Sequence, residues 1–333
     1  MRRMIKIILL SFAAFSTSLM VIGLTMRGLS RDIAPSGKLY DVGGYKLHMD
    51  CRGENNGYPT IIFESGSSTN SPIYHHLAEN LSQTHKFCTY DRAGLGWSEA
   101  SGLPTKIPEL SLQLNKLLEQ ANIKKPFVLA GHSIAGLFMK DYINRYPDDV
   151  LAIGFLDASH PDQIEAFGIK SERVDSYPFE FRILKLAINV GLTQFYNPLQ
   201  LSQYELDNYP PEIVAQLNFI TQRTTYIDGI FGEMSGLDAS FKSTPRDLDY
   251  ADLPVLVVSA GEELDSSQIG DLAPSAKEFR EIWLGLQRTL AELSTSSTHI
   301  VMNSANHMSM FINKDNADIV ANHIRELVKS TQL

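Results

Sequence analysis

The stretch Val128-Leu129-Ala130-Gly131-His132-Ser133-Ile134-Ala135-Gly136 decides the fold of this chain. It predicts a compact buried strand that ends at Gly131, a sharp turn at Ser133, and a helix that begins directly after it. Such a turn needs small residues around its centre, and Gly131 and Ala135 stand two positions before and after Ser133. The turn would hold the Ser133 hydroxyl above the sheet, where the helix N-terminus favours negative charge. Ser133 is therefore our candidate nucleophile, and a helix N-cap serine is the alternative interpretation.

On both sides of this stretch, short strand-like runs alternate with amphipathic, helix-like segments. Alternation of this kind predicts an α/β fold with a mostly parallel sheet and helices on both faces. Gly43-Gly44 separates two further runs and indicates a hairpin, which would add an antiparallel edge. The expected strands are 38–42, 45–51, 60–64, 86–90, 127–130, 150–156, 255–259 and 299–302, and the expected helices are 72–83, 107–121, 134–146, 275–293 and 317–329.

Regular alternation stops between residues 160 and 250. This segment lacks strand-like runs and contains many aromatic residues. We expect it to form a helical cap over the carboxyl ends of the strands, where open α/β sheets bind ligands. The catalytic core would then comprise residues 38–159 and 251–333.

The N-terminus carries a membrane-targeting pattern. Arg2, Arg3 and Lys6 precede an almost unbroken apolar run from Ile7 to Leu24, about as long as the 17–25 residues that span a bilayer. We expect residues 1–26 to be an uncleaved signal anchor, with 27–37 as a linker and the catalytic domain outside the cytoplasm. A cleaved signal peptide, which would give a secreted protein, and a buried soluble helix are the alternatives.

Three further stretches complete a resemblance to the α/β-hydrolase family, specifically to bacterial serine esterases and lipases, over roughly residues 38–330. The stretch from Tyr90 to Ser98 resembles the family's D-x-x-G-x-G-x-S loop after the fourth strand. The stretch from Phe63 to Ser68 sits where the family builds its oxyanion-hole loop. The stretch from Leu156 to Asp162 resembles the end of the sixth strand in a bacterial esterase-like subgroup.

The resemblance also implies a set of site residues. His307 follows the last expected strand, where the family places its catalytic base. The two backbone N–H groups of the oxyanion hole would belong to Ile134, directly after the nucleophile, and to Ser67. His132, although next to Ser133, is a poorer base because its side chain would leave the turn in another direction.

The triad acid stays open at this stage. The family commonly carries it in the turn after the seventh strand, which makes Asp265 the first candidate. Glu262 and Glu263 stand in the same turn and compete with it. Asp157 is the alternative acid, because it ends the sixth strand, where some lipases keep theirs. If it is not catalytic, Asp157 would accept hydrogen bonds from loop amides at the rim.

The two cysteines, Cys51 and Cys88, fall on the second and fourth strands, which are neighbours in this fold. Neighbouring strands can bring two Cα atoms within disulfide distance. A structural disulfide and two buried thiols both remain open.

The predicted function is hydrolysis of carboxylic esters or related acyl bonds through an acyl-enzyme, without a cofactor or a metal. An acyltransferase and a non-catalytic small-molecule-binding protein are the alternatives. The aromatic cap and the anchor suggest an apolar substrate near a membrane, unless these aromatics form only the cap's own core. A serine at the turn argues against haloalkane dehalogenases and epoxide hydrolases, which use aspartate there. The formal net charge of −9 gives no support for nucleic-acid binding.

Overall fold

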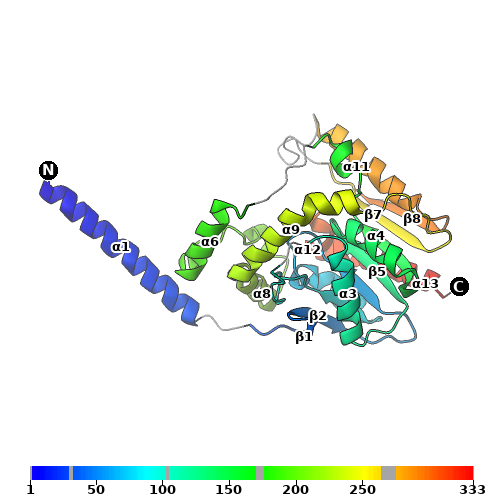
Figure 1. Cartoon of the computed structure of the whole chain (residues 1–333), viewed down its shortest axis with the longest axis horizontal. Coiled ribbons are helices and arrows are strands. Elements are labelled where there is room, and N and C mark those ends of the chain that lie inside the picture. The colour runs from blue at the N-terminus through cyan, green and yellow to red at the C-terminus, as the bar shows by residue number, and fades with distance from the viewer. Residues whose placement is uncertain (1, 30–32, 103–104, 170–175, 264–274, 333) are drawn as a thin grey trace.

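The computed structural model describes residues 2–29, 33–102, 105–169, 176–263 and 275–332 (Figure 1). Within these residues, eight strands form one sheet in the order β1-β2-β4-β3-β5-β6-β7-β8. The strands from β3 onwards pair in parallel, and the β1–β2 hairpin pairs antiparallel with β4. The predicted α/β fold is confirmed. The strands are β1 (Lys38–Asp41), β2 (Lys46–Arg52), β3 (Ile61–Glu64), β4 (Phe87–Tyr90), β5 (Phe127–His132), β6 (Val150–Leu156), β7 (Val255–Ala260) and β8 (Ser297–Met302).

Alternate side chains of the central strand β5 serve two separate cores. Val128 and Ala130 belong to a cluster with helices α2, α12 and α13, whereas Phe127 and Leu129 belong to a cluster with α3, α4 and α11. This period-two pattern places helices on both faces of the sheet. The helices on one face are α2 (His75–Leu81), α12 (Ser309–Ile312) and α13 (Lys314–Ser330), and on the other α3 (Glu109–Gln120), α4 (Ala135–Arg145) and α11 (Ala276–Ala291).

The expected helix 72–83 is two elements. A 3₁₀ turn, η1 (Ser71–Tyr74), comes first, and α2 follows it and ends at Leu81. Pro72 lies in the first turn of η1, where its missing N–H costs nothing. A second 3₁₀ turn, η2 (Pro147–Asp149), separates α4 from β6.

The register of the sheet aligns three strand ends at one rim. Glu64 at the end of β3 lies opposite Gly131 of β5, and His132 of β5 lies opposite Leu156 of β6. The residues that follow these strands therefore leave the sheet side by side. They are the loop 65–68, Ser133 and Asp157.

Between β6 and β7, all regular elements of the described residues are helical; we call residues 160–250 the helical insertion. Its long helix α9 lies close to the loop after β4, because Gly94 and Gly229 leave room for the two backbones. A Cβ atom on Gly94 would lie 2.7 Å from the Gly229 Cα atom. The helices are α5 (Gln163–Ala166), α6 (Phe179–Asn189), η3 (Leu192–Gln194), α7 (Gln203–Leu206), α8 (Pro211–Thr221) and α9 (Thr224–Ser243).

Cys51 and Cys88 lie opposite each other on the antiparallel strands β2 and β4. Their Cα atoms are 4.0 Å apart and their sulfur atoms form a disulfide. The sequence left this pairing open, and the register of the two strands decides it. Closing a loop of this length stabilises the fold by about 4 kcal/mol in the chain-entropy model.

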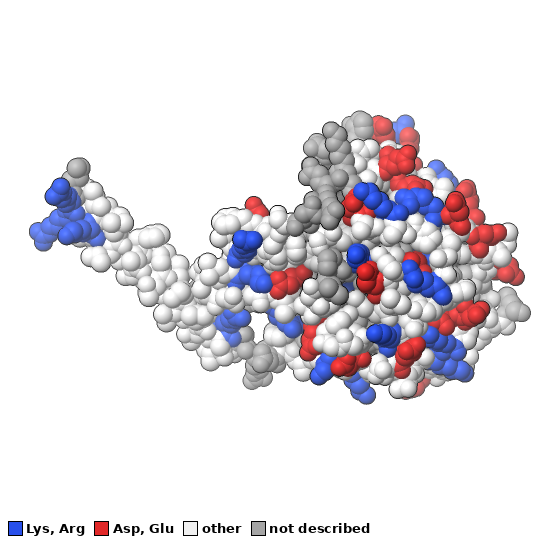
Figure 2. Space-filling model, viewed as in Figure 1, with Lys and Arg blue, Asp and Glu red and all other residues white. Residues whose placement is uncertain are grey.

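The N-terminal helix α1 (Arg2–Leu29) extends away from the sheet (Figure 1). Among the described residues it is the one helix long and apolar enough to cross a membrane. Its side chains are largely exposed, and Gly23 is its buried residue. In Figure 2, basic residues gather at its N-terminal end, and the stretch between that end and the insertion is uncharged.

Candidate active site

Ser133 occupies the sharp turn that the sequence predicted, between β5 and α4. Its backbone φ is +58°, a conformation that costs a residue with a side chain of order 1–3 kcal/mol and that clusters at functional sites. A Cβ atom at Gly131 would lie 2.6 Å from the Ala135 Cβ atom, and one at Gly136 would lie 2.3 Å from the Ser159 oxygen. Small residues around Ser133 are thus a steric requirement of this turn.

His307 lies in the loop between β8 and α12, and its Nδ1 atom is 2.6 Å from the Asp157 Oδ2 atom. The carboxylate is buried, with 3% of its side chain exposed, whereas 43% of the His307 side chain is exposed. The ionised carboxylate accepts the hydrogen bond, so Nδ1 carries the proton. The Nε2 atom of a neutral His307 is then free to accept a proton.

Two further donors hold the Asp157 carboxylate. The backbone N–H of Ala260 donates to its Oδ1 atom at 2.9 Å, and the indole N–H of Trp283 donates to the same atom at 2.7 Å. Trp283 comes from α11 and was not predicted as a site residue. Sequence patterns place it on an amphipathic helix, but they do not show which side chain its indole nitrogen contacts.

The candidate acids are separated by where the structure places them. Asp157, the alternative candidate, contacts His307. Asp265, the first candidate, lies outside the described residues. Glu262 lines the cleft near Ser133. The Glu263 side chain is 93% exposed, and its Oε1 atom lies 3.9 Å from the Arg280 Nη1 atom.

The candidate oxyanion donors flank Ser133. Ile134 follows it in the turn, and Ser67 lies in the loop after β3. Within the described parts of the chain, neither backbone N–H donates to a protein acceptor. Both are therefore available to a bound oxygen.

Buried Arg92 braces the loop that carries Ser67. Its guanidinium donates to the backbone oxygens of Ser65 and Gly66, at 2.7 and 2.6 Å. It also forms ion pairs with Glu64, at 2.5 Å, and with Glu233 of α9, at 2.6 Å. Burial alone would lower the pKa of Arg92, but the two carboxylates raise it above its ordinary value. Arg92 is therefore a permanent cation under the loop.

Glu233 completes this brace from the helical insertion. One of its oxygens accepts from the Ser67 hydroxyl, at 3.0 Å, and from the Ser68 backbone N–H, at 2.6 Å. Its other oxygen accepts from Arg92. The insertion and the sheet thus fix the loop jointly. Sequence analysis did not predict Arg92 or Glu233 as site residues.

His132, the poorer base candidate, is buried beside His307, with the two ring centroids 4.3 Å apart, and is not among the residues that line the cleft with Ser133. Its Nδ1 atom lies 3.0 Å from the Tyr74 hydroxyl, which also accepts from the Gly66 backbone N–H at 2.7 Å. Burial, with a contribution from His307, holds the pKa of His132 well below its ordinary value. A neutral His132 therefore packs beside His307 without adding a second positive charge.

Ser133, Asp157 and His307 line one cleft of about 500 Å³. Phe167 of the insertion and Phe279 of α11 stack with ring centroids 5.0 Å apart, and Trp283 stacks beside them. These three rings give the cleft an aromatic wall. The cleft therefore combines a polar floor at the sheet rim with an apolar side.

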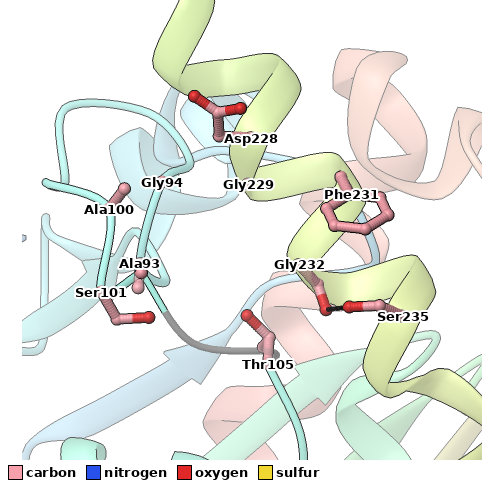
Figure 3. Close-up of a pocket in the computed structure, with 11 residues that line it drawn as sticks. Ala93, Gly94, Ala100, Ser101, Thr105, Asp228, Gly229, Phe231, Gly232 and Ser235 are labelled. Carbon is pink, nitrogen blue, oxygen red and sulfur yellow. Dashed lines mark hydrogen bonds between the residues drawn. The ribbon is translucent and has the colours of Figure 1, made fainter. Parts of the chain in front are cut away.

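A second hollow, of about 300 Å³, lies between the loop after β4 and α9 (Figure 3). Ala93, Gly94 and Gly229 are among its lining residues, and its carboxylate Asp228 is neutralised by Lys185 at 2.8 Å. Neither Ser133 nor His307 lines it, so it is separate from the cleft.

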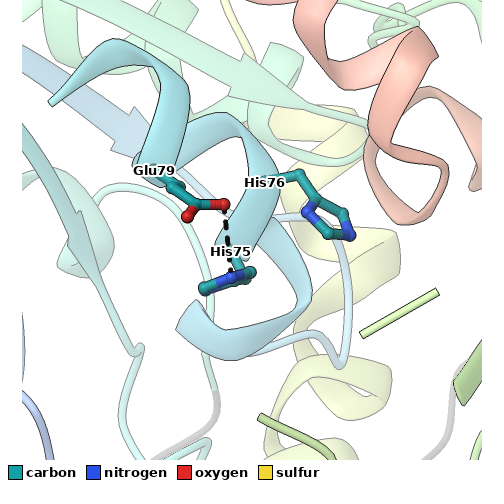
Figure 4. Close-up of side chains that lie close together, drawn as sticks. All are labelled: His75, His76 and Glu79. Carbon is teal, nitrogen blue, oxygen red and sulfur yellow. Dashed lines mark ion pairs between the residues drawn. The ribbon is translucent and has the colours of Figure 1, made fainter. Parts of the chain in front are cut away.

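One side-chain cluster has metal-ligand chemistry. Ligand atoms of His75, His76 and Glu79 lie within 4.8 Å of one another (Figure 4). However, His76 donates through Nε2 to the Asn208 oxygen at 2.8 Å and stacks on Tyr209. These contacts assign His76 a packing role between α2 and the insertion.

A family model described as "alpha/beta hydrolase fold" matches residues 59–273, more than half of the chain. The chain belongs to the α/β-hydrolase family. This α/β hydrolase is 31% identical over 190 residues to the uncharacterized protein YbdG of Bacillus subtilis, covering 55% of this chain and 57% of that protein. It is 23% identical over 343 residues to the uncharacterized protein C23C11.06c of Schizosaccharomyces pombe, covering 92% and 58%. The hydrolase thus spans somewhat more than half the length of these relatives.

Solved structures share the fold of this α/β hydrolase. A thermophilic esterase from Thermogutta terrifontis has a TM-score of 0.58 at 16% identity, covering 90% of this chain and 100% of that chain. An evolved variant of potato epoxide hydrolase has a TM-score of 0.65 at 16% identity, covering 88% and 98%. An enol-lactonase from Burkholderia xenovorans has a TM-score of 0.55 at 17% identity, covering 88% and 100%. At these identities the likeness concerns the fold.

Proposed function

We propose that this α/β hydrolase is a serine hydrolase that cleaves carboxylic esters through an acyl-enzyme. Ser133 is the nucleophile, His307 the base and Asp157 the acid. The observation that carries the proposal is the 2.6 Å hydrogen bond between His307 and Asp157 in the cleft that Ser133 also lines. Nucleophile, base and orienting group are the three parts that acyl transfer by serine requires.

In the proposed reaction, His307 Nε2 takes the proton of the Ser133 hydroxyl as its oxygen attacks the ester carbonyl carbon. The positive charge on the imidazolium is stabilised by Asp157. His307 then gives the proton to the leaving alcohol oxygen, and the C–O bond breaks. Water attacks the acyl-enzyme by the same route in reverse, which releases the carboxylic acid and restores Ser133.

The carbonyl oxygen becomes negatively charged during both attacks. We propose that the backbone N–H groups of Ser67 and Ile134 bind it. A donor aimed at an oxyanion contributes about 3–4 kcal/mol of transition-state stabilisation. Arg92 and Glu233 hold the Ser67 loop and do not themselves contact the reacting atoms in this proposal.

The substrate class follows from the nucleophile and the cleft wall. A serine at this turn favours an acyl substrate over the epoxides and haloalkanes that related enzymes attack with an aspartate. The rings of Phe167, Phe279 and Trp283 favour an apolar acyl or alcohol group.

We also propose that α1 anchors the enzyme in a membrane, with the catalytic domain outside the cytoplasm. Its apolar run is long enough to span a bilayer, and three of its four basic residues, Arg2, Arg3 and Lys6, precede that run. A relative in Saccharomyces cerevisiae, 28% identical over 134 residues, is described as an uncharacterized vacuolar membrane protein; the match covers 35% of this chain and 21% of that protein.

Labelling of the full chain with a fluorophosphonate tests the nucleophile, because this reagent reacts with activated serines. We expect the wild type and Ser159→Ala, which alters another serine of the cleft, to be labelled, and Ser133→Ala to remain unlabelled. Labelling that persists in Ser133→Ala would refute the assignment. Product analysis with an added alcohol acceptor then separates hydrolysis from acyl transfer.

A further inference from the structure

The helical insertion exposes an apolar surface beside the N-terminal helix. We propose that α6 and η3, with the adjoining Phe195 and Tyr196, form a second membrane contact that inserts into the bilayer surface next to α1. This inference rests on the proposed anchoring by α1 and is independent of the catalytic assignment. It assigns a partner, a lipid surface, to the insertion.

The apolar side chains of this segment are more exposed than is expected for a helix that faces only water. On α6, Phe179, Ile183 and Leu186 are 68%, 49% and 57% exposed. Their spacing of four and then three residues places them on one helix face. Of the α6 residues, Ile188 is the buried one. Contiguous apolar surface of this kind marks an interaction site.

The same surface continues beyond α6. Leu192 of η3 is 42% exposed, Phe195 is 48% exposed and Tyr196 is 77% exposed. Aromatic side chains favour the boundary between lipid and water, because one end is apolar and tyrosine adds a polar tip.

Direct contacts fix this segment to the C-terminal part of α1. Gly23 and Gly191 touch through their backbones, since a Cβ atom on Gly23 would lie 2.4 Å from the Gly191 oxygen. Gly191 has a φ of +78°, which glycine adopts without strain. One helical turn after Gly23, the Arg27 guanidinium donates to the Ile188 oxygen at 2.6 Å. Figure 1 shows α6 lying beside this end of α1.

The position of this contact along α1 sets its depth. The apolar run ends at Leu24, and Arg27 is the first charge after it. The contact at Gly23 therefore lies at the expected boundary between hydrocarbon and headgroups. Amphipathic segments at that boundary bury their apolar face about 5–10 Å deep.

A membrane fits this surface better than a protein partner does. Leu24 and Met26 of α1, themselves 43% and 42% exposed, extend the apolar surface of α6 and η3 along the anchor. A bilayer that contains α1 necessarily meets the segment that is packed against the end of that helix. A second copy of the chain is the competing occupant, and the experiment separates the two.

The experiment uses the full chain with an environment-sensitive nitrobenzoxadiazole probe on one introduced cysteine. Both native cysteines are locked in the disulfide, so the new thiol alone reacts. The test variants are Leu186→Cys and Leu192→Cys. Ile22→Cys reports on the anchor, and Leu112→Cys on α3, 48% exposed, is the matched control for an exposed leucine elsewhere. Circular dichroism of each variant checks that it is folded, without reference to the catalytic assignment.

Each variant is reconstituted in phosphatidylcholine–phosphatidylglycerol vesicles, with and without acyl-chain nitroxide quenchers. We expect the probes at 22, 186 and 192 to be quenched about twofold or more, as for groups that reach the acyl boundary, and the probe at 112 to be unaffected. If only the probe at 22 is quenched, the anchor stands and the second contact is refuted. If none is quenched, both membrane proposals fail. Blue-shifted emission at 186 and 192 without quenching, but dependent on protein density, would replace the lipid surface with a second copy of the chain.

Discussion

Buried carboxylates lie on both sides of Ser133, but their negative charges are balanced in different ways. On one side, Asp157 accepts hydrogen bonds from two neutral donors and from His307. On the other side, Glu64 and Glu233 share the permanent cation Arg92. Among the described residues, His307 is the one group that can form an ion pair with Asp157 within 4.0 Å. The charge of Asp157 therefore has no fixed counter-ion, whereas the charges of Glu64 and Glu233 are paired with Arg92.

This difference matches the two tasks that we propose. A carboxylate that must stabilise a positive imidazolium is most effective when no other cation already compensates it, because the attraction then develops during the reaction. Carboxylates that only brace a loop gain from permanent pairing, because a buried unpaired charge is costly. Substitutions on the Asp157 side should therefore lower the reaction rate directly. Substitutions on the Arg92 side should act through the position of the Ser67 loop and the stability of the fold.

The largest effect should come from Asp157→Asn. The amide can donate where the carboxylate accepts, so His307 takes the wrong tautomer and its charged form loses its partner. By analogy with serine proteases, kcat should fall about 10⁴-fold. Ester turnover with a chromogenic substrate measures it, and Asp265→Asn is the matched control. A greater loss in Asp265→Asn than in Asp157→Asn would transfer the acid's role to Asp265.

The next effect should come from Glu233→Gln, which weakens the brace of the Ser67 loop. We expect kcat to fall about tenfold, below the ~10²–10³-fold cost of losing an oxyanion donor itself. The folded state should also lose stability, because Arg92 keeps only one carboxylate partner. Asp228→Asn, on the same helix but paired with Lys185, is the control. Equal effects of the two substitutions would show that Glu233 acts only through general stability.

Trp283→Phe tests a single hydrogen bond on the Asp157 side. The ring remains to pack in the cleft wall, but the indole N–H to Asp157 is lost. We expect kcat to fall by up to about tenfold, which is less than the full ~1.5–3 kcal/mol of a hydrogen bond to a charged group, because two other donors to Asp157 remain. KM should change little. A KM increase at unchanged kcat would mean that Trp283 only binds substrate.

The smallest effect on activity is expected at His160, which follows β6 on the Asp157 side and should act instead through a pH-dependent loss of stability. Burial lowers the pKa of His160 to about 4, and its neutral Nδ1 atom accepts from the Asp162 backbone N–H at 3.1 Å. The unfolded chain takes up this proton near pH 6.5, so stability falls as the pH drops from about 6.5 to 4, by at most about 3 kcal/mol. Urea unfolding at several pH values should show this slope in the wild type and a shallower one in His160→Gln. An unchanged slope would contradict it.

The sequence predicted those features that depend on contiguous residues. Ser133 was predicted because the strand, the turn and the helix that position it are adjacent in the chain. The alternating strands and helices were predicted from hydrophobic periodicity, with boundaries shifted by one or a few residues. His307 was singled out by its position after the last strand.

The features that sequence reasoning left open or missed depend on distant segments. The contact of Trp283 with Asp157 and the contact of Glu233 with Arg92 join residues 126 and 141 positions apart. Periodicity tells which face of a helix is buried, but not which donor on that face meets which acceptor. Cys51 and Cys88 became a defined pair only with the register of β2 and β4.

The most direct test of the account is to trap the acyl-enzyme. The wild type is mixed with an excess of a p-nitrophenyl ester, quenched in acid during turnover, digested and analysed by mass spectrometry. We expect the acyl group on the peptide that contains Ser133, in wild type and in Ser159→Ala, and no acyl group in Ser133→Ala. Turnover without an acyl group on Ser133 would contradict the central claim. An acyl group on another residue that is still present in Ser133→Ala would also contradict it.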